Sequence, residues 1–511
     1  MKYKKVFLIL ICTLFLTSCK PEDAPKKDED YAFLVADEGE VTMPLTPFES
    51  LDPVSTTNMS YFYLCSLVYD GIYTLDTSYK PILALGESEQ ISGKTITIKL
   101  KDGVTFHDGS ELNANDVVET LAHIKTVGIG VYADLIKNPI DGTFSLNCEK
   151  VNNKTIRFTW NGAGPLLKEY LIFPIVKYKN NGSEMPLGTG PFKFERYDVK
   201  KAIYLSRYNY YFGELPSITK ITGVVHEDED LIYTSLETGR VNVSTAWSND
   251  YGRFYNNDKF SAEIFAGNKI TFLFLNPNRT LNAKENRRAI FSLINRDELI
   301  KNALKDRGVA TYSFINPKSY YKRPVNTNFD EEKVKNLLKE QKLKLSLYFY
   351  YNNETQIKVA NQILRLLREY GVEVTTIPEY GDFETYKKNL AAGNYDMAIA
   401  NMNINIIPTF SFDLNSGITF PYKDEVLTGI NNIISECDNN SDFKKAITDA
   451  DAYIYNESVF VPLFFNENAM IYKNNIIGEK ASNNIYPYNT LRKAYFTEKE
   501  ESENLEKDNN K

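Results

Sequence analysis

The chain has 511 residues, of which 43% are hydrophobic and 25% are charged, so it is long enough to bury large cores without disulfide or metal support. At about 150 residues per domain, this length favours roughly three domains. Lysine and arginine total 59 against 67 acidic residues, a net charge of −8, which argues against nucleic-acid binding because that requires positive charge opposite phosphates. With three histidines, a catalytic metal site built on several imidazoles is not expected.

The N-terminus has the layout of an export signal. Residues 6–16 form an apolar run too short to span a membrane, and they follow the basic residues Lys2, Lys4 and Lys5. The segment Leu16-Thr17-Ser18-Cys19 resembles a bacterial lipobox, in which the cysteine carries the lipid. We therefore expect residues 1–18 to be a lipoprotein signal peptide, Cys19 to be the lipidated anchor and residues 19–30 to be a charged tether. Ordinary secretory cleavage that leaves Cys19 unmodified is the alternative.

The remaining cysteines outside the signal are Cys65, Cys148 and Cys437. An odd number at wide spacing is not typical of a disulfide framework, so we expect small buried apolar side chains. One disulfide is possible, but the sequence does not assign it.

The body of the chain alternates between strand-like and helix-like segments. Period-two alternation predicts strands, whereas apolar residues spaced three and four apart predict helices. Asn113 is a candidate helix N-cap, with Asp116 three residues later. In chain order we predict a strand over 95–100, a helix from 114, helical spacing over 282–304, a strand over 344–349, a helix over 355–370 ended by Gly371, and a strand opening at 372–374. This alternation predicts α/β domains.

Short motifs follow one another along this body. They are Leu51-Asp52-Pro53, Val68-Tyr69-Asp70-Gly71-Ile72, Lys80-Pro81-Ile82-Leu83-Ala84, Phe106-His107-Asp108-Gly109, Ala114-Asn115-Asp116, Gly188-Thr189-Gly190-Pro191-Phe192, Asn286-Arg287-Arg288-Ala289-Ile290, Asn295-Arg296-Asp297 and Tyr395-Asp396. In this order they resemble the family 5 extracellular solute-binding proteins, the receptor subunits of oligopeptide, dipeptide and nickel ABC importers. In that family the last aspartate closes a late strand. The resemblance covers residues 31–496.

The resemblance implies an α/β, three-lobed periplasmic-binding-protein-like fold of type II, similar to cluster C, in which two main lobes close on a ligand cleft. The implied lobe I comprises residues 31–66, 187–268 and 481–496. Lobe II would be 67–186 and lobe III 269–480. Residues 497–511 are predicted to be a charged, solvated tail.

Two polar clusters invite a catalytic or metal-binding interpretation, but each has a structural explanation. His107-Asp108-Gly109 fits a tight turn in which glycine adopts a left-handed conformation. The run from His226 to Asp230 lacks the spacing of a calcium loop and fits the start of a helix over 231–236, where acidic residues are favoured by the helix dipole. No Gly-x-Ser-x-Gly nucleophile motif and no glycine-rich phosphate loop occurs.

Residues 395–410 carry the expected ligand-binding loop. Peptide-binding members of the family have an aspartate a few residues before a proline, and this aspartate pairs with the peptide ammonium group. In this sequence Ile404 occupies that position, between Asn403 and Asn405. Losing the carboxylate removes a charge-assisted bond worth about 1.5–3 kcal/mol, so either the solute is not an ordinary free peptide or another acid supplies the charge. A slip of one residue in the alignment is the alternative.

Other predicted ligand contacts come from earlier segments. Trp247 follows a segment that resembles a strand entering the cleft, although a large aromatic side chain fits a core equally well. Thr57, Asn58 and Tyr61 follow the Leu-Asp-Pro motif in a loop that approaches the cleft in relatives.

The resemblance implies a membrane-anchored substrate-binding subunit of an ABC importer that captures a peptide or peptide-like solute for permease and ATPase subunits. We expect a monomer on the extracytoplasmic face of the cell membrane, and the Lys-over-Arg usage favours a Gram-positive surface. No enzyme activity, cofactor or metal site is expected. Nickel is disfavoured because no histidine lies near residues 403–405 and the sequence places no arginine for a carboxylate-rich chelator. The alternatives are a receptor or adhesin without transport, and a secreted hydrolase on the same scaffold.

Overall fold

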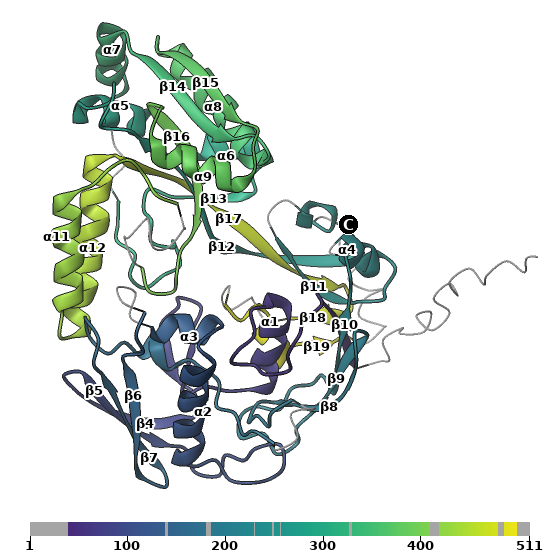
Figure 1. Cartoon of the computed structure of the whole chain (residues 1–511). Coiled ribbons are helices and arrows are strands. Elements are labelled where there is room, and N and C mark those ends of the chain that lie inside the picture. The colour runs from purple at the N-terminus through teal and green to yellow at the C-terminus, as the bar shows by residue number, and fades with distance from the viewer. Residues whose placement is uncertain are drawn as a thin grey trace, which may run out of the picture. The chain divides into compact units, whose positions relative to one another are not determined.

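A computed structural model describes most of the chain (Figure 1). The described residues are 39–137, 142–179, 185–228, 230–247, 250–255, 257–325, 330–408, 418–478 and 485–497. The predicted signal peptide, Cys19, the tether and residues 498–511 of the predicted tail lie outside them. Among the described residues, no helix is long and apolar enough to cross a membrane. Cys65, Cys148 and Cys437 are free thiols.

The first sheet is built from residues far apart in the chain. Its order is β1 (Glu40–Leu45), β10 (Lys220–Val225), β9 (Ala202–Arg207) and β8 (Phe192–Asp198), with β1 parallel to β10. Helix α1 (Met59–Val68) contacts β1 and β8 of this sheet, and the 3-10 helix η4 (Pro487–Arg492) contacts α1. The short strands β18 (Ile476–Ile477) and β19 (Tyr495–Phe496) pair with each other. Helix α4 (Asp230–Glu237) follows β10, as the acidic run predicts.

A second sheet has the antiparallel order β4 (Gly86–Ser92), β5 (Thr95–Leu100), β7 (Thr155–Trp160) and β6 (Leu146–Asn152). Beside it lie α2 (Ala114–Val127), α3 (Val131–Ile136), the 3-10 helix η2 (Lys168–Leu171) and the pair β2 (Tyr73–Leu75) and β3 (Pro81–Leu83). The predicted strand over 95–100 is confirmed. Asn113 and Asp116 form a capping box at the start of α2, as predicted.

The third sheet has seven strands. Its order is β11 (Val243–Trp247), β17 (Phe460–Lys473), β12 (Phe260–Leu275), β16 (Met397–Asn403), β14 (Lys344–Tyr350) and β15 (Glu373–Glu379), and β13 (Gly308–Ala310) also pairs with β17. Helices α5 (Lys284–Leu293), α6 (Arg296–Leu304), α7 (Glu331–Gln341) and α8 (Glu354–Glu369) contribute to one core. Helices α9 (Phe383–Ala392), α11 (Glu425–Glu436) and α12 (Asn440–Glu457) contribute to another. Alternating β12 residues enter the two cores, so the sheet is buried on both faces and the expected α/β architecture is confirmed.

The long strands β12 and β17 join the two ends of this sheet. The first half of β12 pairs with residues 467–473 of β17, of which residues 468–472 also pair with β11. The second half of β12 pairs with residues 460–465 of β17 and with β16. A register shift separates the halves between Ala266 and Ile270. The predicted boundary between residues 268 and 269 lies inside this irregularity. The strand β12 runs through this predicted boundary without a break (Figure 1). The lobe boundaries themselves stay predictions.

The helical spacing predicted over 282–304 falls in two helices, because α5 ends before Ile294 and Asn295 caps α6. Buried Arg296 stabilises the break by donating to the carbonyl oxygens of Phe291 and Ile294 at 3.0 and 2.6 Å. Asp396 does not close a strand but precedes β16, where its carboxylate accepts bonds from the amide and hydroxyl of Ser346 at 2.9 and 2.7 Å. It therefore ties the start of β16 to β14.

Motif residues around the first two sheets hold parts of the fold together. Asp52, followed by buried Pro53, accepts bonds from His123 at 2.8 Å and from Tyr178 at 3.0 Å. A side-chain carbon on Gly190 would lie 2.5 Å from the Val68 carbonyl carbon, so this close approach requires glycine. The other motif residues of this group are Asp70, Gly71, Phe106, His107, Asp108, Gly109, Asp116, Gly188 and Pro191.

His107 packs against the Gly-Thr-Gly-Pro turn. Its amide donates to the Gly188 carbonyl, and its Nε2 lies 3.0 Å from the Gly190 carbonyl oxygen. The following Asp108 accepts a bond from the Ser110 amide, and Gly109 has a φ of 81°, which makes the predicted tight turn. Burial lowers the pKa of His107 to about 4, so the neutral ring is the stable form.

We predict that His107 makes the fold sensitive to acid. The pKa of His107 is lower in the folded chain than its ordinary value of about 6.5. The neutral ring therefore contributes fully to the free energy of unfolding above pH 6.5, and roughly 2–3 kcal/mol of this contribution is lost as the pH falls towards 4. His107→Gln keeps an N–H donor for Gly190 but does not titrate. Urea unfolding at pH 7 and pH 4.5 should show a smaller decrease in the free energy of unfolding for this variant than for the wild type. Equal losses in both proteins would contradict the prediction.

An ion pair joins the C-terminal segment to the loop after α1. Arg492 Nη1 lies 2.7 Å from Asp70 Oδ1 and 3.2 Å from the Tyr211 hydroxyl, and Nη2 donates to the main-chain carbonyls of Ser66 and Tyr69. The Asp70 side chain is 6% exposed, so this pair is largely removed from solvent.

We predict that Arg492→Met lowers the free energy of unfolding by about 3 kcal/mol, because it leaves a buried carboxylate without its cation. The matched control is Lys344→Met, which removes the exposed Lys344–Glu373 pair and should change stability by less than about 0.5 kcal/mol. Urea denaturation of both variants measures the difference. Similar values for the two would show that Asp70 does not depend on Arg492.

Candidate functional site

The residues predicted after the Leu-Asp-Pro motif lie at the start of α1. Asn58 is the N-cap of this helix: its side chain accepts from the Tyr61 amide at 2.9 Å and donates to Thr46 Oγ1 and the Pro47 carbonyl, both at 2.8 Å. Tyr61 is fully buried, and its hydroxyl donates to the Leu51 carbonyl at 2.7 Å. Thr57, just before the cap, is exposed. Asn58 and Tyr61 thus hold structural positions, and their contact with a solute stays a prediction.

Trp247 is the last residue of β11, where its main chain pairs with Asn468 of β17. Its side chain lies outside the described part of the structure, so its predicted contact with a solute stays a prediction. The pairing places it on the first half of the long ribbon of β12 and β17.

The predicted ligand loop begins at the end of β16. Asn403 is exposed and pairs with Lys269 of β12, and Asn405 is exposed two residues later. Ile404 between them is 7% exposed and packs in the core beside Met402. Its amide donates to the Asn268 carbonyl at 2.8 Å. Ile404 is therefore a buried, apolar side chain, and its equivalence to the aspartate of peptide-binding members stays a prediction.

The end of β16 has an open side. Its pairing with β14 extends over Met397 and Ala398. Because the Ile404 amide points to β12 and backbone directions alternate, the main-chain groups of Asn401 and Asn403 point away from β12. Within the described residues, no strand pairs with them on that side. Unpaired main-chain groups at a strand edge are the groups to which an extended chain can add.

A small cavity adjoins this open side. It is lined by Asn401 of β16, by Lys269 and Thr271 of β12, by Arg307 after α6, and by Asn353 and Thr355 at the start of α8. Strands β14, β15 and β16 run parallel, so their carboxyl ends meet at this edge, which is where open α/β sheets bind ligands.

Helix α8 holds the end of β16 in place. Asn353 caps the helix by accepting from the Gln356 amide at 3.0 Å. The Gln356 side chain accepts from the Tyr350 amide at 2.9 Å and donates to Asn401 Oδ1 at 2.7 Å. The side-chain Nδ2 of Asn401 in turn donates to Thr271 Oγ1 at 2.7 Å. This chain of bonds links β14, α8, β16 and β12 around the cavity.

The sequence did not single out Lys269, Arg307 or Asn401. Asn401 lies two residues before the predicted pair of asparagines, so its strand position was the available signal. Arg307 follows α6 and enters the site because β13 pairs with β17, a contact between residues more than 150 positions apart. No local pattern reports such a contact.

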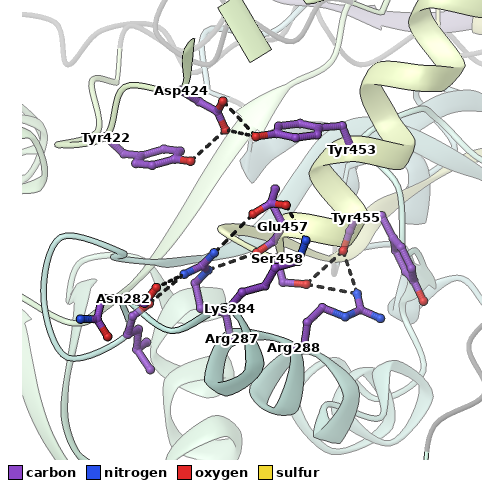
Figure 2. A network of polar contacts seen from close by, with 11 residues as sticks. Asn282, Lys284, Arg287, Arg288, Tyr422, Asp424, Tyr453, Tyr455, Glu457 and Ser458 are labelled. Carbon is purple, nitrogen blue, oxygen red and sulfur yellow. Dashed lines mark hydrogen bonds and ion pairs between the residues drawn. The ribbon is translucent and has the colours of Figure 1, made fainter. Parts of the chain in front are cut away.

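A second polar network, shown in Figure 2, contains the predicted motif residue Arg288. Arg287 donates to the Leu281, Asn282 and Glu457 carbonyls, and Lys284 pairs with the Glu457 carboxylate at 2.6 Å. Arg288 donates to the Tyr455 carbonyl and Ser458 Oγ at 2.8 and 3.2 Å. Asp424 accepts hydroxyl bonds from Tyr422 and Tyr453. The basic side chains are directed at carbonyls and acids of the chain itself, so this network joins α5 to α12.

Two other predicted features have structural contacts. Asp297 lies in the first turn of α6, where the helix dipole favours an acid. His226 is buried between the Val224 carbonyl and the Ser235 hydroxyl, at 2.9 and 2.7 Å. Among the described residues, no group of three or more His, Cys, Asp or Glu side chains could hold a metal ion.

Comparisons with known proteins agree with this architecture. The oligopeptide-binding protein AppA of Bacillus subtilis is 23% identical over 96% of this chain and 97% of its own. The nickel-binding protein NikA of Staphylococcus aureus is 24% identical over 78% of this chain and 79% of its own. The crystal structure of the ABC transporter substrate-binding protein CtaP from Listeria monocytogenes matches with a TM-score of 0.72 at 22% identity, covering 91% of this chain and all of that one.

A family model gives the assignment. The model for bacterial extracellular solute-binding proteins, family 5 middle, matches residues 78–416, which include both the second sheet and the end of β16. The resemblance seen in the short motifs is thereby confirmed, and the chain belongs to the family 5 bacterial extracellular solute-binding proteins.

Proposed function

We propose that this protein is the substrate-binding subunit of an ABC importer and captures a peptide or peptide-like solute for a permease. The observation that carries the proposal is the open side of β16, where the main-chain groups of Asn401 and Asn403 face away from β12. An extended peptide main chain can pair with such an edge whatever its side chains are. Family membership and the similarity to the oligopeptide-binding protein AppA support the same role.

The fold also supports binding rather than catalysis. The AppA and NikA relatives are both named as binding proteins. The strands β12 and β17 provide a continuous connection with a register shift at residues 266–270, which is a suitable place for a hinge. We propose that closure about this ribbon encloses the solute and that the closed form docks on the permease.

The protein is proposed to act as a monomer anchored outside the cell. Cys19 would carry the lipid, residues 19–30 would form the tether, and the low arginine usage supports a Gram-positive surface. The family's extracytoplasmic role supports this location.

The solute is not expected to depend on a free amino terminus, because Ile404 is buried and carries no charge. We predict that a free tetrapeptide and its N-acetylated form bind with dissociation constants that differ by less than about tenfold, or 1.4 kcal/mol. Isothermal titration calorimetry with the paired peptides measures this, and Ile404→Asp should introduce a preference for the free amine.

Two results would count against parts of this proposal. A preference for the free amine above tenfold in the wild type would show that another carboxylate replaces the one missing at Ile404. Mass spectrometry that finds a non-peptide solute co-purifying with the protein, together with no binding of any peptide, would contradict peptide capture itself.

Lipid anchoring has a separate test. We predict that radiolabelled palmitate enters the wild-type protein and that Cys19→Ala releases the protein to the medium, because the lipid is the membrane attachment. Cys65→Ala is the matched control, since that thiol is buried inside the folded chain and should leave anchoring unchanged. Retention of Cys19→Ala at the membrane would contradict the anchor.

A further inference from the structure

A buried carboxylate joins the residues of predicted lobe II to those of predicted lobe III. Glu169, in the 3-10 helix η2, is 2% exposed. Its Oε1 accepts a hydroxyl bond from Tyr320 and another, at 3.0 Å, from Tyr321, in the loop over 311–325 that follows β13. The predicted boundaries put Glu169 in lobe II and both tyrosines in lobe III. These two lobes are not consecutive in the chain, so the contact is separate from the ribbon of β12 and β17.

Main-chain and apolar contacts accompany the carboxylate. The Tyr320 amide donates to the Ser78 carbonyl at 3.0 Å, and the Gly164 amide donates to the carbonyl of Ser435, in the last turn of α11. Leu167, just before η2, is 1% exposed and packs in the core that contains residues of β12 and α12. We call the side chains that meet here the interlobe contact: Leu167, Glu169, Tyr320 and Tyr321.

Each side of the interlobe contact is held by its own lobe. In the loop over 311–325, Arg323 Nε lies 2.6 Å from Asp451 Oδ2 of α12, and the Phe314 amide donates to the same carboxylate at 3.2 Å. In η2, the Tyr170 ring stacks on Trp160 of β7 with the ring centres 4.4 Å apart. The loop is therefore tied to α12 and η2 to the second sheet, so separation of the lobes breaks the interlobe contact as a unit.

The chemistry of the interlobe contact makes it reversible. Burial of Leu167 and of the tyrosine rings favours contact between the lobes. Burial of an ionised carboxylate opposes it, and the two hydroxyl bonds offset part of that cost. When the lobes separate, Glu169 returns to water and this cost is removed.

We propose that the interlobe contact sets the balance between the closed and open forms of the protein, and that Glu169 is the positioning residue whose buried charge lets the closed form reopen. The inference rests on the proposed function, because a receptor that closes about the ribbon of β12 and β17 must also release its solute. Removing the charge should hold the lobes together, whereas removing a tyrosine hydroxyl should separate them.

The surroundings of Glu169 give the direction of a pH effect. Its charged or titratable neighbours come from four places: Lys168 and Tyr170 of η2, Tyr320 and Tyr321 of the loop, Asp76 in the turn between β2 and β3, and Lys444 of α12. Lys168 pairs with Glu89 of β4. Burial raises the pKa of Glu169 in the closed form, so that form binds a proton more readily than a form with the carboxylate in water. Acid therefore favours closure, and this gain is lost as the pH rises through the raised pKa.

Hydrogen exchange of two main-chain amides tests the proposal on the purified protein without added solute. The amides at 320 and 164 donate to acceptors in the opposite lobe, so their exchange reports separation of the lobes. In Glu169→Gln, both amides should exchange about threefold more slowly than in the wild type at pH 7.5, because no charge is buried. At pH 5.5 the ratio should fall to below about twofold, because the wild-type carboxylate takes up a proton. Tyr321→Phe should speed both amides about tenfold, because it leaves the buried carboxylate with one bond fewer.

Two controls separate opening from unfolding. Tyr422→Phe removes a hydroxyl bond of 2.8 Å to Asp424 inside predicted lobe III and should leave both amides as in the wild type. The Phe314 amide, bonded within the same lobe, should exchange at one rate in all variants. Wild-type exchange in Glu169→Gln at pH 7.5, amides at 320 and 164 that change independently, or faster exchange at Phe314 in Tyr321→Phe would overturn the inference.

A peptide probe separates this inference from the proposed function. N-acetyl-tetraalanine, followed by stopped-flow dissociation, should leave Glu169→Gln about threefold more slowly than the wild type, in line with the exchange ratio. If the exchange results hold and no peptide binds, peptide capture is contradicted and the interlobe contact is supported. If the peptide binds and Glu169→Gln exchanges and releases it as the wild type does, the inference is overturned and peptide capture is supported.

Discussion

The continuous main-chain pairing of β12 with β17 is the constraint on which the candidate site depends. Residues 260–266 of β12 belong to the part of the sheet that includes β11, and residues 269–275 pair with β16. Lys269 lies within the register shift between Ala266 and Ile270, and the Asn466 side chain fills the space beside Gly267. A second shift follows Thr271, so Lys269, Thr271 and Asn466 line the cavity at an irregular part of this pairing.

Local patterns predicted the parts of the fold that local physics determines. The alternation over 95–100, the capping box at Asn113 and the turn at Gly109 each depend on neighbours within a few residues, and each is confirmed. Asn58 shows the limit of this approach. The same side-chain amide suits a helix cap and a ligand contact; the structure shows the cap, and the ligand contact stays a prediction.

Site residues that depend on distant pairing could not be predicted in this way. Arg307 reaches the cavity through the pairing of β13 with β17, and the position of Asp396 before β16 depends on Ser346 of β14. The break between α5 and α6 also requires Arg296, which donates to the Pro462 carbonyl on β17. In each case the decisive contact joins residues at least 50 positions apart in the sequence. Periodicity describes only neighbouring residues, so it cannot predict such a contact.

The half-paired end of β16 has a further consequence for the empty protein. A strand edge that accepts a solute's main chain also accepts a strand from another molecule, which is how edge strands start aggregation. Lys269 stands across from Asn403, and the side chains of Asn401 and Asn403 at this edge are polar. A charge and amides at the edge oppose pairing between two copies of the chain, while a single small solute meets no such penalty. The same few side chains thus favour the pairing of a short solute with β16 over the pairing of a second copy of the chain.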